Sequence, residues 1–178
     1  MEKNLDINNN GGLTMKHCLD CGTELEEKFL EKEGVIPYCG HCKAFRFPTF
    51  NVAVSMIVLN ETEDKILLLR QKTMVGYNLV AGFVNKGEAA EHAVTRELQE
   101  EVGIELLDYR FNKSEYYEAS NTLMLNFICK ANSESLVCDE DEVDYAEWFS
   151  IEETRATIEQ GSLAHKFLEH FIAHPITF

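Results

Sequence analysis

The segment from Gly82 to Ile104 places the strongest restriction on how this chain can fold. A glycine opens the segment, and a helix-forming run follows in which Glu97, Glu100 and Glu101 lie within about two turns of a helix. Like charges at these spacings repel by a few tenths of a kcal/mol when exposed, and by more when buried. A helix that keeps these acids together therefore needs something to offset their repulsion.

The spacing predicts a helix from about residue 88 to residue 102, ended by Gly103 in a left-handed conformation. One i, i+4 ridge of this helix is apolar and can face a core: Ala90, Val94, Leu98 and Val102. The acids flank that ridge. A divalent cation would reverse their repulsion, because carboxylate oxygens are ligands that Mg²⁺ prefers. Arg96 can pair with Glu100 or orient a neighbouring acid.

Two Cys-x-x-Cys pairs precede this segment, Cys18 with Cys21 and Cys39 with Cys42. Two such pairs at this separation are typical of a zinc site built from two knuckles. Because four protein thiolates leave no open coordination position, we expect a structural Zn²⁺ rather than a catalytic one. A segment of about thirty residues buries little core, so the metal should help it fold.

Composition excludes several classes of function. A formal charge of −15 disfavours loose binding to nucleic acid or to anionic membrane, since both require a basic surface. No apolar run approaches the ~20 residues that cross a bilayer. Six cysteines without an export signal indicate a reducing, cytoplasmic environment. The polar first fifteen residues predict a disordered leader.

The remainder of the chain alternates between strand and helix patterns. Apolar and β-branched runs predict strands at residues 51–60, 63–72, 77–84, 106–119, 121–131 and 143–150. Residues 106–131 should form an antiparallel hairpin. Residues 151–174 predict one or two amphipathic helices with Leu163, Phe167, Leu168 and Phe171 facing inward. This pattern indicates an α/β fold with a mixed sheet covered on both sides.

The segment resembles the Nudix box, G-x5-E-x7-R-E-U-x-E-E-x-G-U with U aliphatic, at every fixed position from Gly82 to Ile104. The resemblance implies a Nudix-type α/β/α sandwich preceded by a small zinc ribbon. We therefore expect a leader over residues 1–15, a zinc ribbon over 16–46 and a Nudix hydrolase domain over 47–178.

The resemblance also implies roles for individual residues. The positions matching Glu97, Glu100 and Glu101 hold Mg²⁺ or Mn²⁺, and the backbone carbonyl matching Ala81 is a common further ligand. The position matching Glu88 supports the loop. Glu142, in an acidic stretch before the last strand, matches a glutamate that completes the metal shell or serves as base, although such a charge run is usually a solvated loop.

The ribbon and "AGFV" (Ala81 to Val84) resemble the NADH pyrophosphatase branch of the family. Beyond the box, however, "SEYYEASNT" departs from that branch's S-Q-P-W-P-F-P-x-S, and an acid near Glu118 replaces the proline typical of ADP-ribose hydrolases. Tyr116 or Tyr117 could stack on a base, and strand alternation allows only one of them to do so. Arg70 could reach a phosphate, or it could simply be an exposed residue at a strand end.

We predict metal-dependent hydrolysis of the pyrophosphate bond of a small-molecule nucleotide, with NADH, NAD⁺, FAD and ADP-ribose as the leading substrates. A non-catalytic module that senses a nucleotide on the same scaffold, with the ribbon contacting protein or nucleic acid, is the alternative. Removal of nucleotide caps from RNA is a further rival, which the net acidity disfavours. Relatives commonly form homodimers, but no residue of this sequence locates an interface.

Overall fold

A computed structural model describes residues 5–7, 13–72 and 75–178. The chain divides into two compact units, Met1–Thr49 and Phe50–Phe178. In the part of the chain that is described, no helix is both long enough and apolar enough to cross a membrane.

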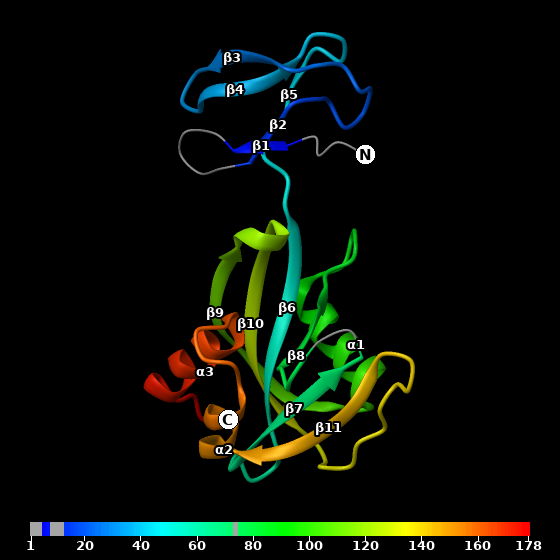
Figure 1. Cartoon of the computed structure of the whole chain (residues 1–178), viewed down its shortest axis with the longest axis vertical. Helices are drawn as coiled ribbons and strands as arrows, with labels where there is room; N and C mark the ends of the chain where they lie inside the picture. Colours follow the sequence, from blue (N-terminus) through cyan, green and yellow to red (C-terminus); the bar gives the residue numbers. More distant parts are fainter. Residues whose placement is uncertain (1–4, 8–12, 73–74) are drawn as a thin grey trace. The chain divides into compact units, whose positions relative to one another are not determined.

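The first unit contains two small antiparallel sheets (Figure 1). One consists of β1 (Leu5–Ile7) and β2 (Leu13–Met15), and the other of β3 (Glu26–Leu30), β4 (Gly34–Cys39) and β5 (Ala44–Phe45). Two segments of the predicted leader therefore form strands instead, because backbone hydrogen bonds can pair segments whose composition alone argues against a core. The rest of the predicted leader, residues 1–4 and 8–12, lies outside the described residues.

The second unit is built around a six-stranded mixed sheet. Its strands are β6 (Asn51–Leu59), β7 (Lys65–Gln71), β8 (Val80–Phe83), β9 (Leu106–Tyr117), β10 (Thr122–Ala131) and β11 (Val143–Ser150). The order is β11-β7-β6-β10-β9, with β8 also paired to β6. Strands β6 and β10 are parallel and the other pairs are antiparallel, which confirms the predicted hairpin of β9 and β10.

Helices cover both faces of this sheet (Figure 1). Helix α1 (Ala90–Val102) packs on β6 and β8, α2 (Ile151–Thr157) contacts β7 and β11, and α3 (Leu163–Ala173) contacts β9. A 3-10 turn, η1 (Glu118–Ser120), joins β9 to β10. The predicted α/β/α sandwich is confirmed.

Strand alternation divides the core into two layers. Leu67 and Leu69 of β7 pack in the layer under α1, whereas Ile66 and Leu68 pack in the layer under α2 and α3. The predicted apolar ridge of α1 lies in the first layer, with Val94, Leu98 and Val102 fully buried. The side of α1 next to that ridge is consequently held against the ends of β7 and β8, where the acids lie.

Candidate metal-dependent active site

Helix α1 supplies a group of acids to a cleft of about 480 Å³. The helix ends at Gly103, whose φ of 68° is left-handed, and its amide bonds to the carbonyl of Gln99. The cleft is lined by residues of the helix, of β6, β7, β8 and β10, of η1, and of the loops after β8 and before β11: Ala53, Gln71, Ala81, Gly82, Phe83, Asn85, Arg96, Glu97, Glu100, Glu101, Ser120, Thr122, Met124 and Glu142. The structure thus brings the five predicted metal-site residues Ala81, Glu97, Glu100, Glu101 and Glu142 together in one cleft.

Arg96 lies at the centre of a hydrogen-bond network. Its guanidinium donates to both oxygens of Glu88, at 2.8 and 3.0 Å, and to the carbonyl of Phe83 at 2.9 Å. It also donates to Glu97 at 2.8 Å and to Glu100 at 3.0 Å. The Arg96 hydrogen bonds hold the pKa of Glu88 down at about 2, and Glu88 in turn accepts from the backbone amide of Asn85. Arg96 therefore orients the acids and ties the glycine loop to the helix.

Glu101 is the most constrained acid of the cleft. It is 3% exposed, and its Oε1 accepts a 3.2 Å hydrogen bond from Gln71. Its Oε2 is buried and has no hydrogen-bond partner among the described residues. Burial, followed by the negative charges of Glu97 and Glu142, raises the pKa of Glu101 to about 7. A buried carboxylate oxygen without a donor is costly unless a cation or a proton satisfies it.

Glu97 and Glu100 differ in their surroundings. Burial raises the pKa of Glu97 even though Arg96 lowers it, whereas the side chain of Glu100 is 59% exposed. A cation in the cleft would lower the repulsion between Glu97, Glu101 and Glu142, and their oxygens are hard ligands suited to Mg²⁺. The donor set of this cleft therefore fits a divalent metal.

A second cavity of about 640 Å³ adjoins the cleft, because both are lined by Gln71, Ala81 and Met124. Tyr116 and Tyr117 both line this second cavity, so strand alternation does not keep either of them away from it. The hydroxyl of Tyr116 donates to Asn121 at 2.6 Å, and its ring packs edge-on against Phe50. Lys166 of α3 supplies a positive charge to the same cavity.

The structure does not bring Arg70 to the described lining of either cavity. Its side chain lies 3.5 Å from the carboxylate of Asp144 and over the ring of Tyr145. Successive residues of a strand point to opposite faces, so Gln71 reaches the cleft and Arg70 does not. Sequence reasoning missed Gln71, because nothing in "ILLLRQ" distinguishes it from an ordinary strand-end residue.

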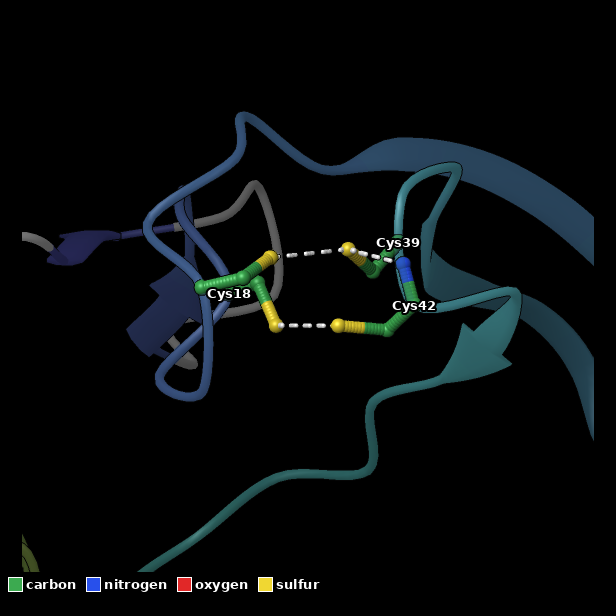
Figure 2. A group of neighbouring side chains, drawn as sticks. Cys18, Cys39 and Cys42 are labelled. Carbon is green, nitrogen blue, oxygen red and sulfur yellow. Dashed lines mark hydrogen bonds between the residues drawn. The ribbon is translucent and has the colours of Figure 1, made fainter.

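A cluster of four cysteines lies in the first unit. The sulfur atoms of Cys18, Cys21, Cys39 and Cys42 are all within 4.8 Å of one another. Figure 2 shows Cys18 on one side of the site, facing Cys39 and Cys42 on the other. The sulfurs of Cys18 and Cys42 are 3.9 Å apart, and those of Cys21 and Cys39 are 3.5 Å apart. A tetrahedral zinc with Zn–S bonds of about 2.3 Å requires sulfurs roughly 3.8 Å apart. The spacing therefore fits zinc.

Arg46 lies beside this cluster. Its Nε donates to the sulfur of Cys18 at 3.2 Å, and its Nη2 pairs with Asp20 at 2.7 Å. Burial raises the pKa of the Cys18 thiol, but the hydrogen bonds from Arg46 and from backbone amides outweigh it and lower the pKa to about 6. The thiolate, which is the form that binds metal, is thereby favoured. His41 is exposed and lies outside the four-sulfur group.

Comparisons with known proteins agree with this geometry. The model of the family described as "NUDIX domain" matches residues 49–171. A curated relative, "NAD-capped RNA hydrolase NudC" from Pseudomonas aeruginosa (strain LESB58), is 32% identical over 167 residues, which are 91% of this chain and 58% of that protein. This chain thus spans little more than half the length of that relative.

Solved structures share the fold. A NUDIX hydrolase from Nitrosomonas europaea superposes with a TM-score of 0.61 at 20% identity, over 90% of this chain and 92% of that one. The NUDIX domain of Shewanella oneidensis NrtR, solved in complex with ADP ribose, gives a TM-score of 0.55 at 15% identity over 76% of this chain and 92% of that one.

Proposed function

Because this chain belongs to the Nudix family, we propose that it is a metal-dependent pyrophosphohydrolase acting on a dinucleotide or another nucleoside diphosphate derivative. The observation that carries the proposal is Glu101, a buried carboxylate with one unpartnered oxygen, set beside Glu97 and Glu142 in an open cleft. Such an arrangement is unfavourable unless a cation or a proton completes it, and the neighbouring acids and the open cleft favour a cation.

We assign Mg²⁺ or Mn²⁺ to the carboxylates of Glu97, Glu100, Glu101 and Glu142 and to the carbonyl of Ala81. A divalent cation bound there would neutralise phosphate charge and lower the pKa of an attacking water. Glu97 is held by Arg96 and Glu101 by Gln71, so both acids are oriented before any ligand arrives. Arg96 acts as a positioning residue, since its donors are directed to protein oxygens.

In the reaction, the oxygen of water bonds to one phosphorus and the bond from that phosphorus to the bridging oxygen breaks. The products are two monophosphates. The proton of the water passes to a carboxylate of the cleft, and our candidate is Glu142, which lies on a different segment from the helical acids. This exposed side chain can exchange the proton with solvent.

The second cavity favours a substrate with a bulky group on each side of the pyrophosphate. With the phosphates at the acids, one half of a dinucleotide can occupy the cavity that Tyr116, Tyr117 and Lys166 line. NADH, NAD⁺, FAD and ADP-ribose fit this description. The NrtR domain was solved with ADP ribose bound, which supports ADP-ribose as one of these candidate substrates. The name of the Pseudomonas relative adds NAD-capped RNA, in which the cap provides the same pyrophosphate.

The test is turnover of these five substrates with Mg²⁺ or Mn²⁺, comparing wild type with Glu101→Gln. Since changes to outer-shell partners of a metal cost 10–100-fold, loss of a ligand should lower kcat/KM by at least about 10²-fold. Glu91→Gln is the matched control, because Glu91 is an exposed acid at the start of the same helix. Full turnover by Glu101→Gln would contradict the proposal.

The alternative is a module that binds a nucleotide without cleaving it. Tight binding of a dinucleotide with no monophosphate released would favour this alternative. A net charge of −15 argues against broad RNA affinity, so we expect hydrolysis of a capped RNA to depend on the cap and not on the RNA sequence.

We also propose that the four cysteines hold one structural Zn²⁺, because their sulfur spacing matches a closed tetrahedral site. A cytoplasmic location and a homodimeric state stay predictions. Cell fractionation and light scattering test them.

A further inference from the structure

The two oxygens of Glu101 have different surroundings. Oε1 accepts the amide hydrogen of Gln71, with Nε2 at 3.2 Å. Oε2 is buried and has no donor within the described part of the chain. The Gln71 amide therefore makes the two oxygens of this carboxylate different, and Oε2 is the oxygen with no competing hydrogen bond.

Gln71 is well placed to do this from outside the helix. It is the last residue of β7, where its backbone pairs with Val143 of β11. Leu69, two residues before Gln71, is fully buried in the core. The backbone amide of Lys72, the next residue, donates to the carbonyl of Glu142. The donor thus comes from a fixed strand end that also sets the position of the segment bearing Glu142.

The neutrality of the amide matters as much as its position. Glu97 and Glu100 are held by the cation Arg96, which offsets part of their charge. A second cation beside Glu101 would compensate its charge and compete with a metal, and another carboxylate would add repulsion. A glutamine donates one hydrogen bond and adds no charge of its own beside Glu101.

We propose that Gln71 is a positioning residue for metal binding: it fixes the carboxylate of Glu101 so that Oε2 is the oxygen presented to the cation. This inference rests on the proposed function for the metal site and adds a residue outside the Nudix box. Gln71 also lies in the wall shared by the two cavities, so the amide that orients Glu101 borders the space assigned to the substrate.

The test is Mn²⁺ binding by calorimetry, without substrate, to Gln71→Met, which keeps the chain length and removes the donor. We expect binding to weaken by about 10–100-fold, the usual cost of losing an outer-shell partner. Gln71→Asn retains an amide but is too short to reach, and it should show the same loss. Gln99→Met makes the same chemical change at an exposed position of α1 and should bind like wild type.

A double-mutant cycle separates positioning from a general structural effect. In a Glu101→Gln background, Gln71→Met should cause no further loss, because the group through which Gln71 acts has been altered. An equal loss in that background would overturn the inference, as would unchanged Mn²⁺ affinity in folded Gln71→Met or Gln71→Asn. Binding that depends on Gln71 in a protein that hydrolyses no dinucleotide would support the inference and contradict the proposed function.

Discussion

Gly82 illustrates how a missing side chain makes room for the acids. A Cβ at this position would lie 1.9 Å from Cδ of Glu97 and 2.1 Å from its Oε1, far inside any contact distance. Gly82 pairs with Val54 of β6, so its backbone cannot easily move away. The carboxylate of Glu97 can occupy its place beside the sheet only because residue 82 is glycine.

We therefore predict that Gly82→Ala displaces the carboxylate of Glu97 and lowers kcat/KM by roughly 10²-fold, the usual effect of a 1 Å misplacement at a reacting centre. Steady-state kinetics at saturating Mg²⁺ provides the measurement. Gly76→Ala is the control for backbone strain alone: its φ of 85° should cost some stability, but a Cβ there meets nothing within 4 Å, so turnover by the folded protein should stay near wild type. Wild-type activity in Gly82→Ala would show that this position of Glu97 is not required.

The pKa of Glu101 makes a prediction about stability. Burial raises this pKa to about 7 from an ordinary value of 4.5, so the folded protein holds a proton that the unfolded chain releases. Between these values stability falls as pH rises, because the unfolded state binds fewer protons. Above about pH 7 the charged carboxylate carries its full penalty.

In buffer without added Mg²⁺ or Mn²⁺, Glu101→Gln should therefore stabilise the protein more at pH 8 than at pH 4.5. The difference should be on the order of 3 kcal/mol, from about 1.4 kcal/mol per pKa unit. Urea unfolding at the two pH values measures it, without a chelator so that the cysteine site keeps its metal. A pH-independent effect of the substitution would contradict the assigned burial cost.

Among the helices and strands, α1 could be predicted from sequence because it contains most of the Nudix box. The fixed spacing places the acids and the buried ridge on neighbouring faces of one helix, so local geometry suffices. The strands, and the helical character of residues 151–174, followed from periodicity for the same reason, although the pattern left open whether one or two helices form there. The start of α1 at Ala90 rather than at about residue 88 is a local difference, since Glu88 bonds to the amide of Asn85 and to Arg96 in the preceding loop.

Contacts between distant elements were not predictable in this way. Gln71 and Glu101 are 30 residues apart on different elements, and no sequence pattern records their hydrogen bond. Arg70 was proposed as a phosphate-binding residue because it lies at a strand end. The face of the sheet to which its side chain points depends, however, on how β7 pairs with β11. The same limit applies to Lys166, whose place in the second cavity depends on how α3 packs.

The glycine that ends helix α1, Gly103, should contribute to the stability of the fold. Its φ of 68° ends α1, and a Cβ there would lie 3.0 Å from Cβ of Val137. Gly103→Ala should cost about 1–2 kcal/mol of stability for the left-handed backbone. Urea unfolding should show this loss of stability. The kcat of the folded protein, measured without urea, should stay near that of wild type. No loss of stability would mean that the helix end rearranges without penalty.

At the scale of the whole molecule, the two units differ in what holds them together. In the first unit the buried hydrophobic residues, among those whose burial is described, are Cys18 and Cys39. The second unit contains two core layers of fully buried aliphatic side chains. The Zn²⁺ proposed for the first unit would therefore take the place of a hydrophobic core there.

We predict one tightly bound zinc per chain, and selective loss of structure in residues 16–46 when a chelator removes it. Metal analysis and hydrogen exchange on the full chain measure both effects. Amides of β6 and β10 should keep their protection. Protection of β3 and β4 that survives complete removal of zinc would contradict a folding role for the metal, and iron in place of zinc would contradict its identity.

The proposed function requires divalent cations at the carboxylates of α1, next to the pyrophosphate of the substrate. A crystal structure with Mn²⁺ and a non-hydrolysable NAD⁺ analogue, with manganese located by anomalous scattering, is the decisive experiment. We expect manganese bonded to Oε2 of Glu101 and to Glu97, with the phosphates beside it. Manganese and pyrophosphate located away from these carboxylates would contradict the proposed function.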